Sequence, residues 1–129
     1  MKSAAFRIVI LLLAGLALAS CRGTPVYNVT SATMASPPGA TQEQVAIAIK
    51  RAGLSKGWQM IDKGPSEIEG RLNLRSHLAV VSITFDTKQF SITYKDSNNL
   101  KYDGSTIHRN YNGWVQNLEQ AILAQTVGL

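Results

Sequence analysis

Alternation of apolar and polar residues in the second half of the chain constrains its fold more than any other feature. Residues 67–75 alternate strictly, and residues 77–86 and 89–95 follow the same period of two. This period is typical of a β-strand with one buried face. The links between these segments are very short, so neighbouring strands must run antiparallel.

A shorter strand is predicted at residues 58–62, before a turn at Gly64-Pro65-Ser66. Together the segments predict a four-stranded antiparallel meander. In the strand at residues 77–86, we expect one face to be buried, the face that carries Ala79, Val81, Ile83 and Phe85. The opposite face carries Leu78 and Val80, which we expect to be exposed on the uncovered side of the sheet.

A helix is predicted on either side of the meander. Thr41 is a good N-cap, and Gln44 stands three residues later, as a capping box requires. Gly57 suits a left-handed C-cap for this helix. Its apolar stripe consists of Val45, Ala48, Ile49 and Ala52. The last helix has a longer stripe, formed by Ile107, Tyr111, Trp114, Leu118 and Ile122.

The element order is therefore α-β-β-β-β-α, which predicts an α+β fold. The simplest arrangement is a two-layer sandwich with both helices on one face of the sheet. Residues 41–129 would form a single globular domain, with Trp58 and Trp114 in its core. Gly53 inside the first helix costs about 1 kcal/mol relative to alanine, unless it permits close packing.

Residues 1–20 have the three zones of a signal peptide. Lys2 and Arg7 supply positive charge, residues 8–18 are apolar or small, and small residues precede Cys21. As a helix the apolar run would extend less than about 20 Å, too short for a bilayer core of roughly 30 Å. We therefore expect a cleaved leader and not a transmembrane helix.

The sequence Leu18-Ala19-Ser20-Cys21 resembles the lipobox of bacterial lipoproteins. The resemblance implies a diacylglycerol on the Cys21 sulfur, cleavage before Cys21 and often a third acyl chain on the new amino terminus. Two or more acyl chains give stable attachment to a membrane. Because Arg22-Gly23 and not Asp follows the cysteine, the resemblance implies the periplasmic face of the outer membrane over the inner membrane in a Gram-negative host. The alternative is an ordinary signal peptide with an incidental cysteine.

Residues 22–40 are rich in Thr, Ser, Ala, Gly and Pro, so residues 21–40 are interpreted as the lipidated Cys21 and a tether. Alternatively, residues 25–29 pair as an extra edge strand. Without the leader, eleven basic and eight acidic residues give a net charge of +3. These charges are scattered, so we expect no nucleic-acid partner and a weak attraction to anionic lipid at most.

Residues 90–122 (FSITYKDSNNLKYDGSTIHRNYNGWVQNLEQAI) resemble a recurring segment of small uncharacterised proteobacterial lipoproteins. Those proteins also carry an amphipathic helix that ends before a Gly-Trp pair, as at Gly57-Trp58. The resemblance spans roughly residues 41–123. It implies a shared fold and envelope location and contributes nothing on mechanism.

The polar loop at residues 96–104 and the start of the last helix hold the candidate binding residues. They are Asp96, Ser97, Asn98, Asn99, Tyr102, Asp103, His108, Arg109 and Tyr111. Asx side chains also cap turns and helix ends, which accounts for such a loop without any function. Asp96, His108 and either Ser97 or Ser105 could compose a catalytic triad. No strained elbow presents either serine, however, so we do not expect an enzyme.

We expect neither a metal nor another cofactor, because His77 and His108 stand far apart in sequence and no ligand motif surrounds them. The favoured function is a lipid-anchored module that binds another envelope protein through the open sheet face. The alternative is a small-ligand or glycan-binding protein that uses residues 96–111, with Tyr94, Tyr102 and Tyr111 lining a pocket.

Overall fold

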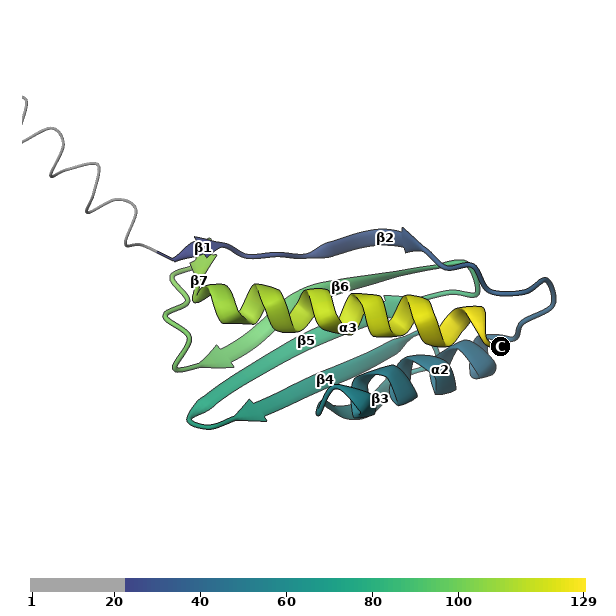
Figure 1. The fold of residues 1–129 in the computed structure, drawn as a ribbon, viewed down its shortest axis with the longest axis horizontal. Helices are drawn as coiled ribbons and strands as arrows, with labels where there is room; N and C mark the ends of the chain where they lie inside the picture. Colours follow the sequence, from purple (N-terminus) through teal and green to yellow (C-terminus); the bar gives the residue numbers. More distant parts are fainter. Residues whose placement is uncertain (1–22) are drawn as a thin grey trace, which may run out of the picture.

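The structure is a computed structural model that describes residues 23–129, so the predicted leader and Cys21 lie outside the described residues. Its elements in chain order are β1 (Thr24–Pro25), β2 (Val29–Thr33), α2 (Gln42–Ser55), β3 (Gln59–Gly64), β4 (Glu67–Leu74), β5 (His77–Phe85), β6 (Gln89–Asn98), β7 (Thr106–Ile107) and α3 (Arg109–Val127). Five strands form one antiparallel sheet in the order β2-β6-β5-β4-β3, and β1 pairs with β7 in a separate two-stranded ribbon (Figure 1).

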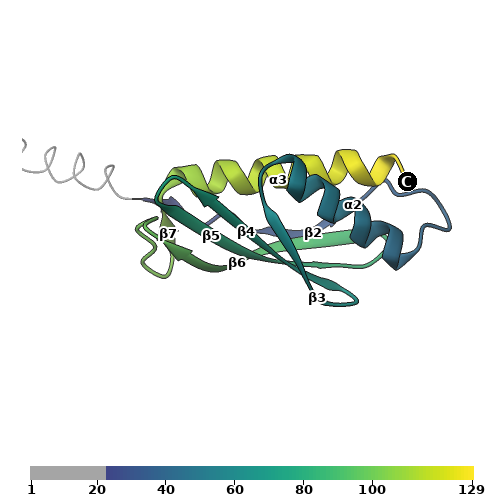
Figure 2. The same cartoon turned by 90° about the horizontal axis from the view of Figure 1, so that it is seen from below.

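Both helices lie on one face of the sheet, and the other face is uncovered by the described residues (Figures 1 and 2). One apolar core fills the space between the two layers. The α+β class is confirmed, and β3 to β6 form a meander as predicted. The sheet nevertheless has a fifth strand, because β2 adds to the free edge of β6.

The N-terminal segment is part of the fold from Thr24 onward, where the sequence predicted a tether. Val29 is buried and lies opposite Ile92 of β6, and the chain beyond β2 buries Met34 as well. This confirms an extra edge strand, but at Val29–Thr33 and not at residues 25–29. The short apolar residues are spread among Thr, Ser and Ala, so their pattern is too weak to predict an edge strand.

One side chain of α3 fixes the segment between β1 and β2. The Asn112 Nδ2 amide donates to Thr24 Oγ1 at 3.1 Å and to the Pro25 carbonyl at 2.9 Å, while its Oδ1 accepts from the Tyr27 N–H at 2.9 Å. The Tyr27 hydroxyl donates to Glu119 one turn or more farther along the helix. Hydrogen bonds from a rigid helix thus replace the apolar contacts that this segment lacks.

The predicted features of α2 are confirmed. Thr41 and Gln44 form the capping box, since each side chain accepts from the other residue's backbone N–H. The predicted apolar stripe is fully buried. Gly57 has φ +85° just beyond the C-cap, a conformation that glycine adopts without strain.

The predicted stripe of α3 needs two corrections. Ile107 precedes the helix and pairs with Thr24 in the β1–β7 ribbon. Trp114 is only half-buried, and Val115 occupies the core in its place. The buried residues of the helix are Tyr111, Val115, Leu118, Ile122 and Thr126. Trp58, in contrast, is buried as expected.

Two glycines bring α2 and the sheet into close contact around Met60 and Trp58. A Cβ at Gly53 would overlap the Met60 side chain, which packs directly against the helix backbone. A Cβ at Gly70 would lie 3.0 Å from Val81 and 3.2 Å from the Trp58 ring. Gly53 therefore permits close packing, which explains a glycine at an interior helical position.

We expect Gly53→Ala to lower the free energy of unfolding by about 1 kcal/mol, because overpacking outweighs the better helix propensity of alanine. In a Met60→Ala background the space is free, so the same substitution should be neutral or stabilising. Urea denaturation of the four proteins in this double-mutant cycle measures both effects. Equal destabilisation in the two backgrounds would show that Met60 is not the cause.

Candidate functional site

The predicted loop starts later than expected, because β6 continues to Asn98. Val81 lies opposite Tyr94 and Val80 lies opposite Asp96, so Lys95 is an extra residue in β6, a β-bulge. Three of the predicted loop residues, Asp96, Ser97 and Asn98, therefore belong to the strand. The strand propensity of these polar residues is low, and pairing with β5 overrides it.

Asx side chains hold the true loop together. The Asp103 carboxylate accepts from the backbone N–H groups and hydroxyls of Ser105 and Thr106 at 2.7–3.4 Å. These hydrogen bonds, led by those from the two N–H groups, lower the pKa of Asp103 to about 2. Asn99 has φ +58° and donates to the Ser76 hydroxyl at 2.9 Å, which ties the loop to the β4–β5 turn. Both residues thus have a structural use.

The triad that the sequence allows is not assembled. The Ser97 hydroxyl bonds to the Tyr94 hydroxyl at 2.7 Å, and the Asp96 carboxylate accepts from the Ser97 N–H. His108 is the N-cap of α3, where its Nδ1 accepts from the Asn110 N–H at 3.1 Å. Arg109 follows at the first helical position and is exposed.

The three candidate tyrosines do come together from β6, the loop and α3. The Tyr94 and Tyr102 rings stack with centroids 4.0 Å apart, and Tyr111 meets Tyr94 edge-on at 5.8 Å. Tyr111 is completely buried, whereas Tyr102 is 41% exposed. Tyr102 thus covers the other two rings from the solvent side.

The Tyr111 hydroxyl is the one buried side-chain polar atom without a hydrogen-bond partner within residues 23–129. Desolvation by burial raises the pKa of Tyr111 far above its ordinary value, and the neighbouring Tyr94 and Tyr102 raise it further. A buried unpartnered hydroxyl costs roughly 1–3 kcal/mol of stability. Such a group in a structured region marks a place where a ligand could supply the missing partner.

A shallow pocket of about 420 Å³ opens beside this cluster. It is lined by residues 94–102, so it includes Tyr94 and Tyr102 but not Tyr111. Lys95, Asp96 and Asn98 contribute exposed polar groups to it. An aromatic platform with several polar groups around it suits a small polar molecule or a sugar better than an apolar ligand.

A second aromatic cluster was not predicted from the sequence. His77 begins β5, and its ring centroid lies 6.2 Å from that of His108 and 6.1 Å from that of Trp114. The His77 Nδ1 bonds to the Asn99 carbonyl at 2.7 Å. Sequence reasoning treated the two histidines separately, because only the return of the chain after β6 brings α3 beside the start of β5.

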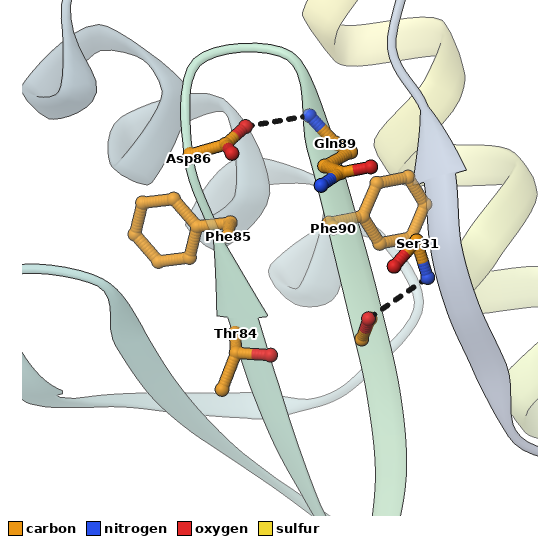
Figure 3. Close-up of a pocket in the computed structure, with 7 residues that line it drawn as sticks. Ser31, Thr84, Phe85, Asp86, Gln89 and Phe90 are labelled. Carbon is orange, nitrogen blue, oxygen red and sulfur yellow. Dashed lines mark hydrogen bonds between the residues drawn. The ribbon is translucent and has the colours of Figure 1, made fainter.

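A further hollow, of about 260 Å³, lies at the opposite end of the sheet, at the β5–β6 turn (Figure 3). Asp86 dominates it, but its carboxylate accepts from the backbone N–H groups of Lys88 and Gln89. These two bonds lower the pKa of Asp86. The Ser31 N–H is likewise bonded to the Ser91 hydroxyl at 2.9 Å. The hollow is therefore lined by groups that hold the turn and the edge strand.

The open face of the sheet carries an ion-pair cluster that the sequence did not reveal. Glu69 of β4 accepts from Lys95 Nζ at 2.8 Å and from Arg71 Nη1 at 3.4 Å. The Glu69 side chain is only 9% exposed. The hydrogen bond from Lys95 lowers the pKa of Glu69, and Glu69 in turn raises that of Lys95.

This cluster corrects the expectation for Val80, which is 1% exposed and not a surface residue. Strand β5 lies between β4 and β6, so Lys95 must cross β5 to reach Glu69, a span of about 10 Å between the outer strands. Its methylene stem passes over the part of β5 that holds Val80 and Ser82. Leu78, near the start of the strand, remains half-exposed.

Comparison of the chain with protein-family models, with curated proteins and with solved structures found no match. Within residues 23–129, neither helix is long and apolar enough to cross a membrane. The same residues contain no group of three or more His, Cys, Asp or Glu side chains that could hold a metal ion.

We expect Glu69→Gln to lower the free energy of unfolding at pH 7 by about 1 kcal/mol, because it leaves Lys95 and Arg71 without their anion. The lowered pKa means that the ionised carboxylate stabilises the folded state above its ordinary pKa, and that this contribution is lost as the pH falls through the native pKa. The difference between variant and wild type should therefore shrink in acid.

Urea denaturation at neutral and acidic pH measures this effect. Glu67→Gln is the matched control, since Glu67 lies on the same face and accepts from the Ser82 hydroxyl, as glutamine also can. A difference between Glu69→Gln and wild type that stays constant with pH would contradict the electrostatic explanation.

Proposed function

We propose that the chain is a lipid-anchored protein of the bacterial envelope, acylated on Cys21 after removal of residues 1–20. It is held on the periplasmic face of the outer membrane, where it binds another envelope protein and catalyses no reaction. The lipobox resemblance at residues 18–21 supports the anchor, and the absence of Asp after Cys21 favours the outer membrane. The open sheet face supports the binding role and is the observation on which that role depends.

The open face has the composition of a specific protein interface. Fixed charges from Glu69, Arg71 and Lys95 occupy its middle, where they would set the register of a partner. Half-exposed Ile61 and Leu78 lie on the same face at either side of this cluster. A partner would gain apolar contacts from these two residues and orientation from the charges.

The anchor is tested by mass spectrometry of the protein purified from bacterial membranes. We expect an N-terminal fragment that begins at Cys21 and carries a diacylglycerol on its sulfur. A Cys21→Ser chain should remain uncleaved and carry no lipid. A wild-type fragment without fatty acid would overturn the anchor, and recovery in the inner-membrane fraction would overturn the outer-membrane assignment.

The binding face is tested by photo-crosslinking in intact cells, with a photoreactive amino acid at Asn73. Asn73 is exposed and lies opposite Leu78 on the open face. We expect a discrete adduct that is lost in a Leu78→Glu chain, because the new charge would be buried against the partner. Leu54→Glu is the control, since Leu54 is 65% exposed on the helical layer. An adduct that survives Leu78→Glu, or no adduct at all, would remove the sheet face as the binding site.

A second candidate function, binding of a small polar ligand or glycan, is favoured by the unpartnered Tyr111 hydroxyl. The Tyr102 hydroxyl bonds only weakly, to the Gly104 carbonyl at 3.3 Å, so its ring can turn away from Tyr94. A sugar ring could then stack on Tyr94 and bring a hydroxyl to Tyr111.

We expect Tyr111→Phe to raise the free energy of unfolding by about 1 kcal/mol, because it removes a buried unpaired hydroxyl. If the pocket binds sugar, the same variant should weaken binding of an N-acetylglucosamine trimer about tenfold, measured by NMR titration. Tyr27→Phe is the control, because the Tyr27 hydroxyl is bonded to Glu119 and lies away from the pocket. A wild-type protein that shows no shifts at residues 94–111 would exclude this class of ligand.

A further inference from the structure

The described chain begins at one end of the long axis of the molecule, and its C-terminus lies at the opposite end (Figures 1 and 2). We call the first of these the entry end. It consists of the β1–β7 ribbon, the β4–β5 turn, the loop after β6 and the start of α3. Printed contacts join these parts: Asn99 to Ser76, the Leu100 carbonyl to the His108 N–H, and Thr24 to Asn112. The entry end is therefore one connected surface.

The position of the acylation site relative to this surface follows from covalent geometry. A single residue, Arg22, separates Cys21 from Gly23. Two residue steps span at most about 7 Å. Gly23 itself is close to the Ile107 backbone, because a Cβ at this position would lie 2.8 Å from the Ile107 carbonyl oxygen. On the proposed function, acyl chains on Cys21 would thus hold the entry end directly against the lipid headgroups.

The exposed charges of the entry end are mainly positive. Arg75 lies in the β4–β5 turn, Lys101 in the loop and Arg109 at the first position of α3, and all three are exposed. The N-terminus of the 19-residue helix α3 adds the positive end of its dipole beside Arg109. The one acidic residue of this loop, Asp103, turns its carboxylate back onto Ser105 and Thr106. An anionic surface that approached this end would meet the three cations first.

Two larger exposed side chains accompany the cations. Leu74, at the end of β4, is 44% exposed, although the period of two places it on the helix-covered face of the sheet. Tyr102 is 41% exposed beside it in the loop that Asn99 ties to the β4–β5 turn. Amphipathic aromatic residues and cations are the residue types that favour the headgroup region of a membrane.

The far end of the molecule differs. It holds the β5–β6 turn and the N-terminus of α2, which contact each other through Gln42 and the Phe85 carbonyl. Its exposed charges are mixed, with Glu43 and Asp86 beside Lys88. The positive bias is thus confined to the end at which the lipid anchor would attach.

We propose that the entry end is a membrane-contacting surface that binds anionic phospholipid headgroups through Arg75, Lys101 and Arg109. This inference rests on the proposed acylation of Cys21 and adds an orientation to it. Three cations and the anchor define a plane, so the long axis of the domain points away from the membrane and the open sheet face stays free for a partner.

Hydrogen–deuterium exchange of the acylated full-length mature protein in vesicles tests this orientation. One set of vesicles contains phosphatidylcholine alone, and the other adds about a quarter of phosphatidylglycerol. We expect peptides that cover residues 74–77 and 98–110 to exchange roughly threefold more slowly in the anionic vesicles, with no change at residues 62–67 and 85–89. About 0.5 M NaCl should remove the difference, because salt screens exposed charges.

The variant Arg75→Glu, Lys101→Glu, Arg109→Glu should also lose the difference. The matched control Arg51→Glu, Lys63→Glu, Lys88→Glu makes the same change in net charge elsewhere on the surface and should retain it. Equal exchange in the two sets of vesicles would overturn the proposal even if Cys21 is acylated. The mass of the N-terminal fragment, measured on the same sample, shows separately whether the anchor itself has failed.

Discussion

A sheet with apolar side chains on only one face is the constraint on which the rest of the structure depends. In β4, β5 and β6 the period of two directs the large apolar residues to one side, so both helices must lie there and share one core. The close approach of α2 at Gly53 and the full burial of Tyr111 follow from this shared space. The second face is then left for polar groups.

The two faces of the sheet meet different physical demands. The covered face is dry, so an unpaired group such as the Tyr111 hydroxyl is conspicuous there. The open face is wet, yet Glu69 is nearly buried because Lys95 crosses a whole strand to reach it. That crossing depends on the bulge in β6, which adds Lys95 without shifting the apolar residues before it. A local irregularity in register thus shapes the surface most suited to recognition.

The sequence predicts the parts of the fold that have a strong local signal. The period of two predicted β3 to β6, and capping at Thr41 and stripe positions predicted both helices. It failed where tertiary contacts decide: Asn112 recruits residues 24–27 from what appears in composition to be a tether, and Lys95 hides Val80. At the candidate site the meeting of Tyr94, Tyr102 and Tyr111 was anticipated, whereas the His77–His108–Trp114 cluster was not. That cluster depends on a return of the chain that no local pattern encodes.

The early start of β1 has a consequence for the working radius of the protein. A chain attached at Cys21 with a long linker could sample a wide volume, but here pairing begins at Thr24 and leaves almost no slack. The span of α3, 19 residues or about 28 Å, then sets the height to which the domain stands above its leaflet. Any molecule that it recognises must itself come within that thin layer, and objects deeper in the compartment are out of range.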